Sequence, residues 1–225
     1  MKLLALDTAT ENCSAALVID GRLLEREIES ERGHAELILP MIDGLLAEAG
    51  VSLAALDGIA FGRGPGSFTG VRIAASVAQG LAFGAGLGVV PVSDLRAVAQ
   101  RALELDPAVA HVLVCNDARM REVYWACFER RESRAEPAGP ERVDPPQGVR
   151  PARADMVGAG RGFAAHPQLS ALTGAHLPAG WDRLLPRAAD IARLAEPEVR
   201  LGRLLAPEAA VPVYVRDQVA RPSSI

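Results

Sequence analysis

Residues 64–72 read Gly64-Pro65-Gly66-Ser67-Phe68-Thr69-Gly70-Val71-Arg72 and join two segments of different character. An apolar strand is predicted before them, within residues 57–62, and the helical spacing of Ala74, Ala78 and Leu81 predicts a helix after them. The glycines permit close backbone approach, and the amides at the start of a helix favour an anion. The same glycines could instead serve tight helix packing or a partner surface. The stretch is not a Walker A loop, because no Lys-Ser or Lys-Thr follows the last glycine.

The segments around this loop predict an α/β order in the first part of the chain. Asp20-Gly21 is a strong hairpin signal, Gly50 is typical of a helix end, and Pro40 kinks the preceding helix or marks its first turn. Ser93 is placed to cap a further helix. Strands are expected at residues 2–6, 14–19, 22–28, within 57–62 and at 89–92. Helices are expected at residues 35–50, 71–87 and from 94 to about 103. The order is therefore βββαβα, followed by a strand and a final helix.

The opening plan recurs further along the chain. Residues 111–116 have the pattern of a strand, a turn led by Asp117 follows, and residues 123–128 have the pattern of the next strand. The repeat suggests two related halves. Residues 129–151 are rich in charge and proline and predict no regular element. Beyond them, a strand is expected at residues 154–157 and a helix at residues 188–195.

The composition is that of an ordinary globular protein. Of the 225 residues, 49% are hydrophobic and 23% are charged, enough to bury a core in one domain or two small ones. No apolar run reaches the roughly 20 residues of a membrane span, and Asp7 stands where a signal peptide needs an apolar region. We therefore expect a cytoplasmic protein that makes no membrane contact. The net charge is −4 and Lys2 is the only lysine, so a solvated surface is favoured over an RNA-binding one.

The cysteine and histidine content gives no sign of a metal centre. The three cysteines are an odd set without metal-ligand spacing, which argues against a disulfide framework and against a zinc site. The four histidines are scattered along the chain. Ser67 lacks the Gly-x-Ser-x-Gly setting of a hydrolase nucleophile. We therefore expect no metal, no cofactor and no catalytic residue.

Two short motifs could belong to a nucleotide site. Asp7-Thr8-Ala9-Thr10 lies in the turn between the first two strands, where hydroxyl groups and free amides can meet phosphate and an aspartate can hold a hydrated metal ion. Gly158-Ala159-Gly160 follows a predicted strand and could admit a base or a ribose. Both also have plainer explanations, since Asp, Thr and Gly are common turn formers. The residues of such a vestigial nucleotide site would be Asp7, Thr8, Thr10, Asp117, Gly158 and Gly160.

Several motifs together closely resemble the TsaB family. They are Asp7-Thr8-Ala9-Thr10, residues 34–40 (His-Ala-Glu-Leu-Ile-Leu-Pro), residues 64–72, residues 117–124 (Asp-Ala-Arg-Met-Arg-Glu-Val-Tyr) and residues 212–216 (Pro-Val-Tyr-Val-Arg). The match covers most of the chain and is strongest before residue 103. The resemblance implies an actin-like or Hsp70-like α/β fold of two ribonuclease-H-like halves, each a mixed sheet flanked by helices. We expect residues 1–105 to form the partner-binding half and residues 106–225 a partly degenerate half.

The resemblance also implies a function. Members of this family take part in making threonylcarbamoyladenosine at position 37 of tRNAs that read codons beginning with A. The chemistry belongs to a larger paralogue, TsaD, which TsaB binds as a scaffold, and an ATPase called TsaE is the third member. We expect this chain to reach tRNA through that complex rather than directly.

One departure separates this chain from the catalytic paralogue. The paralogue carries a His-x-x-x-His metal motif after a Pro-Val pair, and Asp94 and Val98 stand at those positions here. Valine cannot ligate a metal, which disfavours a metallopeptidase. An independent kinase-like enzyme of the actin fold remains the main alternative, but it needs a phosphate loop in each half, and Asp7 and Asp117 are the only matching residues.

The partner surface is expected on the helices predicted at residues 35–50 and 71–87. Small residues on the second helix would let a partner helix approach closely, and a weaker homodimer through the same surface stays open. The residues assigned to this contact are Ile38, Met41, Ile42, Leu45, Ala74, Ala75, Ala78 and Ala82.

Overall fold

The computed structural model of the protein describes residues 1–216, so residues 217–225 of the expected second half lie outside the described residues. A first sheet has the strand order β3-β2-β1-β4-β5. Its strands are β1 (Lys2–Asp7), β2 (Asn12–Ile19), β3 (Arg22–Glu29), β4 (Gly58–Gly62) and β5 (Val89–Val92). The sheet is mixed, because β1 pairs antiparallel with β2 and parallel with β4.

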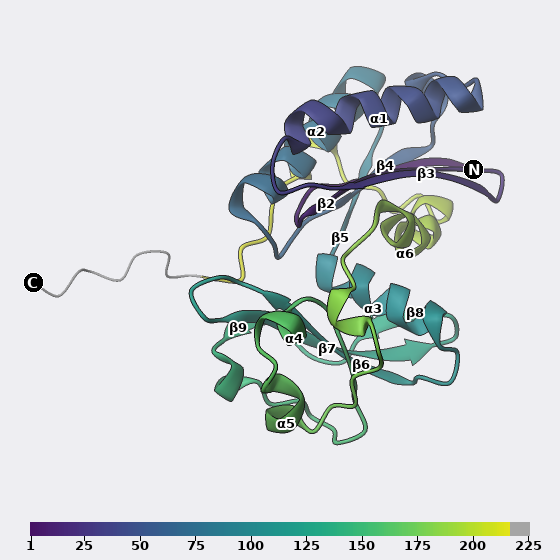
Figure 1. The fold of residues 1–225 in the computed structure, drawn as a ribbon. Coiled ribbons are helices and arrows are strands. Elements are labelled where there is room, and N and C mark those ends of the chain that lie inside the picture. The colour runs from purple at the N-terminus through teal and green to yellow at the C-terminus, as the bar shows by residue number, and fades with distance from the viewer. Residues whose placement is uncertain (217–225) are drawn as a thin grey trace, which may run out of the picture.

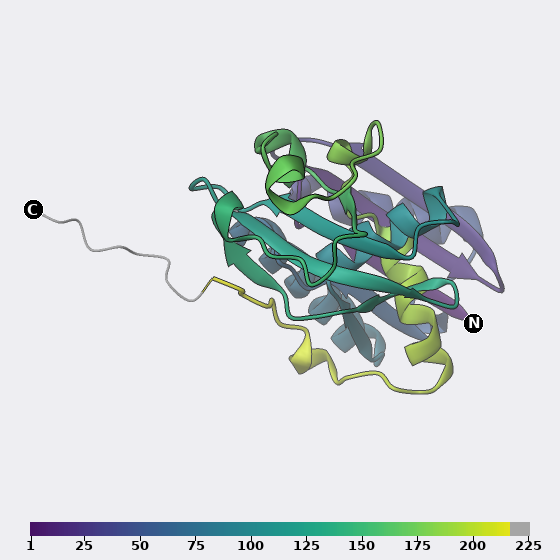
Figure 2. The same cartoon turned by 90° about the horizontal axis from the view of Figure 1, so that it is seen from below.

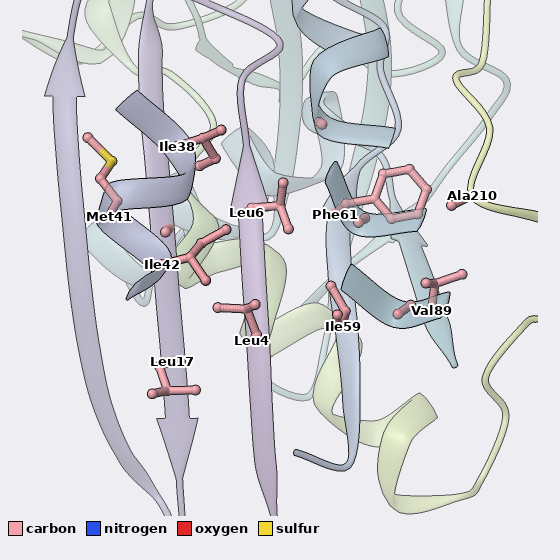
Figure 3. Packing of buried hydrophobic residues seen from close by; sticks show 14 of the residues in the cluster. Leu4, Leu6, Leu17, Ile38, Met41, Ile42, Ile59, Phe61, Val89 and Ala210 are labelled. Atoms are coloured by element: carbon pink, nitrogen blue, oxygen red, sulfur yellow. The ribbon is translucent and has the colours of Figure 1, made fainter. Parts of the chain in front are cut away.

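Helices cover both faces of this sheet. On one face lie α1 (His34–Ala49) and α2 (Phe68–Ala85), and on the other lies α6 (Ala188–Arg200). In Figure 3 the labelled side chains of α1 lie over those of β1 and β2 and form one continuous apolar cluster with them. Burial of this kind contributes about 25 cal/mol per Å² of apolar surface, so the sheet and its helices stabilise one another.

A second mixed sheet follows in the chain. Its strands are β6 (His111–Asp117), β7 (Val123–Arg131), β8 (Arg134–Pro137), β9 (Arg142–Asp144) and β10 (Val157–Ala159). The order is β10-β6-β7-β8, and β9 also pairs with β7. The helices here are α3 (Asp94–Leu105), α4 (Gly162–Ala165) and α5 (Leu169–Thr173). Short 3₁₀ turns lie at Leu53–Ala55, Pro146–Gly148, Trp181–Arg183 and Pro207–Ala209.

The two sheets and their helices form successive layers (Figure 1). From one side to the other, Figure 1 shows α1 and α2, the first sheet, α6 with α3, the second sheet, and α4 with α5. Figure 2 shows the same elements from below, with the last described residues running along the side of the molecule. This architecture confirms the predicted α/β class of two halves, each with a mixed sheet flanked by helices. None of the helices within residues 1–216 is long and apolar enough to cross a membrane.

Two helices pack across residue 105, the boundary expected between the halves. Helix α3 packs on the second sheet, where Leu95, Val98 and Leu103 are buried against Val112 and Val114. Helix α6 returns to the first sheet, although it lies late in the chain. Helix α3 follows the first sheet in the chain but packs on the second, and α6 follows the second sheet but packs on the first. Both helices lie in the space between the two sheets (Figure 1).

The local predictions hold best where periodicity is strong. The strand at residues 89–92, the capping of α3 by Ser93 and the recurrence of the opening strand pair are confirmed. The expected absence of regular structure over residues 129–151 is wrong, since β7 extends to Arg131 and β8 and β9 follow. These short strands pair with β7, so their order comes from a neighbouring strand more than from their own sequence.

Candidate functional site

The glycine-rich loop is packed against the turn between β1 and β2. The Ser67 N–H donates to the Ala9 carbonyl over 2.7 Å, and the Thr8 hydroxyl donates to the Gly70 carbonyl over 2.7 Å. A Cβ on Gly66 would lie 2.5 Å from the Ala9 carbonyl oxygen, and one on Gly70 would collide with the Thr8 carbonyl oxygen. The glycines are therefore required for tight packing between two backbone segments, the plainer of the explanations considered for the sequence.

Beneath this turn lies a buried pair of acids. Asp7 ends β1 and Asp94 begins α3, and both are fully buried. A Cβ on Gly62 would collide with a carboxylate oxygen of each, so glycine at this position makes room for the pair. The Gly64 N–H donates to Asp94 Oδ2, and the Asp94 N–H donates to the Gly64 carbonyl over 3.1 Å. The pair thus ties the loop to the start of α3.

Burial dominates the acid–base properties of this pair. Desolvation raises the pKa of Asp7 to about 6, although N–H donation from Ala9 acts in the opposite direction. The pKa of Asp94 is raised well above its usual range by desolvation and by the neighbouring charge of Asp7. Both carboxyl groups therefore bind a proton more strongly in the folded protein than in the unfolded chain. Asp7 is fully buried and does not line the cavity described below, so the hydrated metal ion considered from the sequence stays a prediction.

A cavity of about 1020 Å³ lies between the two halves, on the other side of the turn. Its walls include the β1–β2 turn, the start of α1, the start of α2, the β6–β7 turn and residues 213–216. His34 Nε2 donates to the Thr10 carbonyl over 2.8 Å and thereby joins the start of α1 to the turn. This cavity is the candidate functional site.

The segment at residues 212–216 connects the two halves across the cavity. The Val213 N–H donates to the Arg63 carbonyl over 2.8 Å, which holds the segment against the first half. Arg216 pairs with Glu122 over 2.6 Å and donates to the Ala118 carbonyl, both in the second half. Residues 212–216, the last of the motifs shared with the TsaB family, therefore close one side of the cavity.

The residues of the predicted nucleotide site are only partly brought together. Thr8, Thr10 and Asp117 line the cavity, as do most residues of the glycine-rich loop. Gly158 does not provide space for a base, since the ring of Phe163 lies 2.7 Å from the position of its absent Cβ. Gly160 is likewise in contact with the backbone of β6. Gly158 and Gly160 both serve close packing and neither lines the cavity, so their assignment to a nucleotide site stays a prediction without support from this geometry.

The predicted partner-binding residues lie inside the protein. Each is at most 8% exposed and packs between the helices and the first sheet, as Figure 3 shows for part of α1. They are Ile38, Met41, Ile42 and Leu45 of α1 and Ala74, Ala75, Ala78 and Ala82 of α2. This assignment was wrong because the residues that recur at helical spacing are those that the sheet covers. A partner can reach only the opposite faces of these helices.

Sequence reasoning missed three residues that line the cavity. Asn116 is the penultimate residue of β6, Tyr124 lies on β7, and Tyr214 lies in the segment that closes the cavity. Tyr124 and Tyr214 are the only two tyrosines of the chain. Their positions within motifs shared with the TsaB family were the available signal.

Comparisons with known proteins agree with the motifs. A family model described as TsaD, tRNA N6-adenosine threonylcarbamoyltransferase, matches residues 26–168. The chain is 40% identical to the tRNA threonylcarbamoyladenosine biosynthesis protein TsaB of Haemophilus influenzae, over 97% of this chain and 95% of that protein. It is 42% identical to the protein of the same name from Escherichia coli, over 98% and 96%. The solved structure of YeaZ from Pseudomonas aeruginosa has a TM-score of 0.86 at 45% identity and covers 95% of this chain. The chain therefore belongs to the TsaB family of tRNA threonylcarbamoyladenosine biosynthesis proteins.

Proposed function

We propose that this chain is a non-catalytic scaffold subunit in the formation of threonylcarbamoyladenosine at position 37 of tRNAs that read codons beginning with A. In this role it binds and supports a TsaD-type catalytic paralogue in the cytoplasm, with a TsaE-type ATPase as a further member of the complex. The names of its relatives and the matching TsaD family model support the pathway. The outward faces of α1 and α2 support the mode of action.

The observation that carries the proposal is a set of helix glycines without a role in the monomer. Gly44 of α1 and Gly80 and Gly84 of α2 are exposed, and a Cβ on any of them would meet nothing within 4 Å. Glycine inside a helix costs about 1 kcal/mol relative to alanine. Phe83, which is 73% exposed, stands beside Gly84 on α2. A partner helix packed on this face would explain both the small residues and the exposed ring.

The departure from the catalytic paralogue at Asp94 and Val98 supports the non-catalytic role that we propose. Among residues 1–216 no group of three His, Cys, Asp or Glu side chains could hold a metal ion. Asp94 stands where the paralogue has its first histidine, but it is enclosed with Asp7, and Val98 is part of the core. A kinase-like enzyme would need an accessible carboxylate at Asp7.

We expect Phe83→Glu to weaken binding of the TsaD-type paralogue by about 30-fold or more while the chain stays folded. The substitution places an unpaired charge in the contact, which typically costs 2 kcal/mol or more, about 30-fold in affinity. Binding would be measured by calorimetry with the purified paralogue, tRNA modification in the reconstituted system, and folding by circular dichroism. Leu105→Glu is the matched control, since Leu105 is 57% exposed at the end of α3.

The contrary outcome is a folded Phe83→Glu variant that binds the paralogue and supports modification like the wild type. It would exclude this face as the contact. A self-association that Phe83→Glu also removes would assign a homodimer to the same face, in competition with the heterodimer.

A kinase-like enzyme would bind Mg-ATP, and the scaffold role predicts that this chain does not. We expect calorimetric titration with micromolar Mg-ATP to give no saturable heat. The reason is that the backbone of Thr8 and Ala9 packs against the glycine-rich loop and that Asp7 is buried. A micromolar dissociation constant, near −8 kcal/mol in binding free energy, would instead favour a nucleotide-dependent enzyme.

A further inference from the structure

Strand β3 leaves one edge of the first sheet without a neighbouring strand among residues 1–216. It stands at the end of the order β3-β2-β1-β4-β5 and pairs along its whole length with β2. Its eight residues include no proline, and its pairing with β2 contains no bulge. Proteins usually shorten, bend or cover such an edge, because its outward N–H and C=O groups invite another strand. The edge of β3 is therefore a surface on which a further strand can pair.

The backbone groups that point away from β2 belong to alternate residues of β3. The turn at residues 20–21 has two consecutive positive φ angles, so Ile19 and Arg22 form the first hydrogen-bonded pair of the hairpin. The Glu25 carbonyl accepts from Arg26 Nη1 over 3.1 Å, which agrees with an outward direction for this carbonyl. Since the pairs alternate, the outward groups belong to residues 23, 25, 27 and 29.

The side chains of β3 differ in charge between the two faces of the sheet. Leu23 packs with the cluster that includes α6, and Leu24 packs with the cluster that includes α1. Odd positions therefore share one face, and even positions share the other. The odd face carries three exposed acids, which are Glu25, Glu27 and Glu29. The even face carries two arginines and two apolar side chains, which are Arg22, Leu24, Arg26 and Ile28.

The acids of the odd face are only partly neutralised within the protein. Glu29 pairs with Arg161 over 2.9 Å. Arg187 comes near Glu25 and Glu27 but forms its ion pair with an aspartate of its own helix. Neither Glu25 nor Glu27 has an ion-pair partner within residues 1–216. The odd face of the edge therefore presents negative charge to an approaching strand.

These charges oppose pairing with a second copy of the chain. Two β3 strands related by a two-fold axis perpendicular to the sheet place residues of the same face opposite each other. A register centred on residue 25 sets Glu25 against Glu25, and one centred on residue 26 sets Arg26 against Arg26. Centred on residues 24 and 27, the registers set Arg22 against Arg26 and Glu25 against Glu29. Like charges directly opposite each other destabilise a strand pair, so each of these registers is disfavoured.

We propose that β3 is a docking edge for a partner strand with basic residues at alternate positions, and that its charges exclude a second copy of this chain. The basic side chains would lie opposite the three acids of the odd face, and apolar side chains between them would meet Leu24 and Ile28. Main-chain hydrogen bonds would supply the affinity of such a contact, and the charges its selectivity. The edge does not include the outward faces of α1 and α2, so the inference is independent of the proposed scaffold contact.

A charge-reversed copy of this chain is a suitable probe, because it presents a basic strand in the same fold. Its substitutions are Glu25→Lys, Glu27→Lys and Glu29→Lys. In the register centred on residue 27, a wild-type strand and a reversed strand form three opposite-charge pairs, whereas either strand opposes like charges when it meets itself. Each such pair changes affinity about 1.4- to 5-fold. We therefore expect the mixture to associate at least about fourfold more tightly than either chain alone.

Sedimentation velocity of each chain and of the mixture measures this association, and circular dichroism confirms folding. Hydrogen exchange of the β3 amides should slow in the mixture, while exchange in α1 stays unchanged. A matched control makes the same change of net charge on exposed acids away from β3, with Glu104→Lys, Glu132→Lys and Glu208→Lys. Its mixture with the wild type should associate no more tightly than the wild type alone. Any contact through α1 and α2 is common to all mixtures and cancels.

A milder variant tests the exclusion without reversing any charge. Glu25→Thr combined with Glu27→Thr leaves no like charges opposed in the register centred on residue 25, and it keeps the pair of Glu29 with Arg161. We expect this variant to associate with itself about 1.4- to 5-fold more tightly than the wild type does.

Three results would each overturn the inference. The first is a folded reversed copy that binds the wild type no more tightly than the wild type binds itself. The second is a control mixture that associates as tightly as the reversed mixture, and the third is unchanged self-association of the threonine variant. None of these assays contains the paralogue, so the scaffold proposal and this one can fail separately.

Discussion

Replacing Asp94 with asparagine is expected to raise the free energy of unfolding in mildly alkaline solution and to flatten its dependence on pH. The folded protein encloses Asp94 against Asp7, and the pKa of each carboxyl is raised by desolvation. Asparagine resembles the protonated acid in shape. Its oxygen can accept from the Gly64 N–H, as Asp94 Oδ2 does, and its NH₂ group can donate to an ionised Asp7.

The unfolding free energy should fall as pH rises, because the pKa values of both carboxyl groups are raised in the folded protein. A carboxyl whose pKa is higher in the folded than in the unfolded state binds its proton more strongly when folded, so stability is fully present below the unfolded pKa and is lost as pH rises through the folded pKa. For Asp7 the pKa rises from 3.8 to about 6. Each unit corresponds to about 1.4 kcal/mol, so Asp7 alone costs about 3 kcal/mol between roughly pH 4 and pH 8. Asp94 extends the loss to higher pH, because its pKa is raised further.

Urea unfolding of the wild type, Asp94→Asn and Asp7→Asn across this pH range provides the measurement. Both variants should show a shallower decline of the unfolding free energy than the wild type, since each replaces one acid of the pair. Contributions from other titrating groups are common to the three proteins and cancel in the comparison. Parallel pH profiles for all three would show that the pair is not the source of the pH dependence.

The sequence predicts the fold through local signals that act on neighbouring residues. The apolar run of β4, the capping hydroxyl of Ser93 and the Asp20-Gly21 turn between β2 and β3 each determine structure within a few residues, and each was predicted. Helix α3 packs on the second sheet and helix α6 on the first, and this exchange depends on which sheet covers the apolar face of each helix. Periodicity identifies the buried face of a helix but not the sheet that covers it, so the exchange of α3 and α6 between the sheets could not be predicted from the sequence.

The candidate site was predictable only in part, for the same reason. The glycines of residues 64–72 indicate that the backbone there approaches another part of the chain closely. The sequence could not show that Gly66 and Gly70 face the backbone of Thr8 and Ala9. Asn116 could have been noticed as a polar residue on the face of β6 that carries two valines. The apolar residues of α1 and α2 were assigned to a partner because periodicity alone does not distinguish the core of the monomer from an interface.

Two glycines of the same helix are expected to respond in opposite ways to alanine. A Cβ on Gly70 would collide with the Thr8 carbonyl oxygen, which belongs to backbone and cannot rotate away. The β1–β2 turn or the start of α2 would have to shift, and the hydrogen bond from the Thr8 hydroxyl would be lost. Overpacking of this kind typically costs about 1–3 kcal/mol, and because the obstructing atom is backbone we expect Gly70→Ala to lose about 3 kcal/mol of unfolding free energy, the upper end of that range.

Gly84→Ala is the matched variant, in which the same methyl group meets nothing within 4 Å. Alanine favours the helical backbone over glycine, so the monomer should gain about 0.5–1 kcal/mol. If a partner helix packs on this face, the same methyl group should weaken binding of the TsaD-type paralogue while the monomer becomes more stable. Denaturant unfolding of both variants and calorimetry of Gly84→Ala with the paralogue provide the measurement. A destabilised Gly84→Ala monomer would show that glycine is needed there for the fold itself, and undiminished binding by a stabilised monomer would remove the reason for placing the partner on α2.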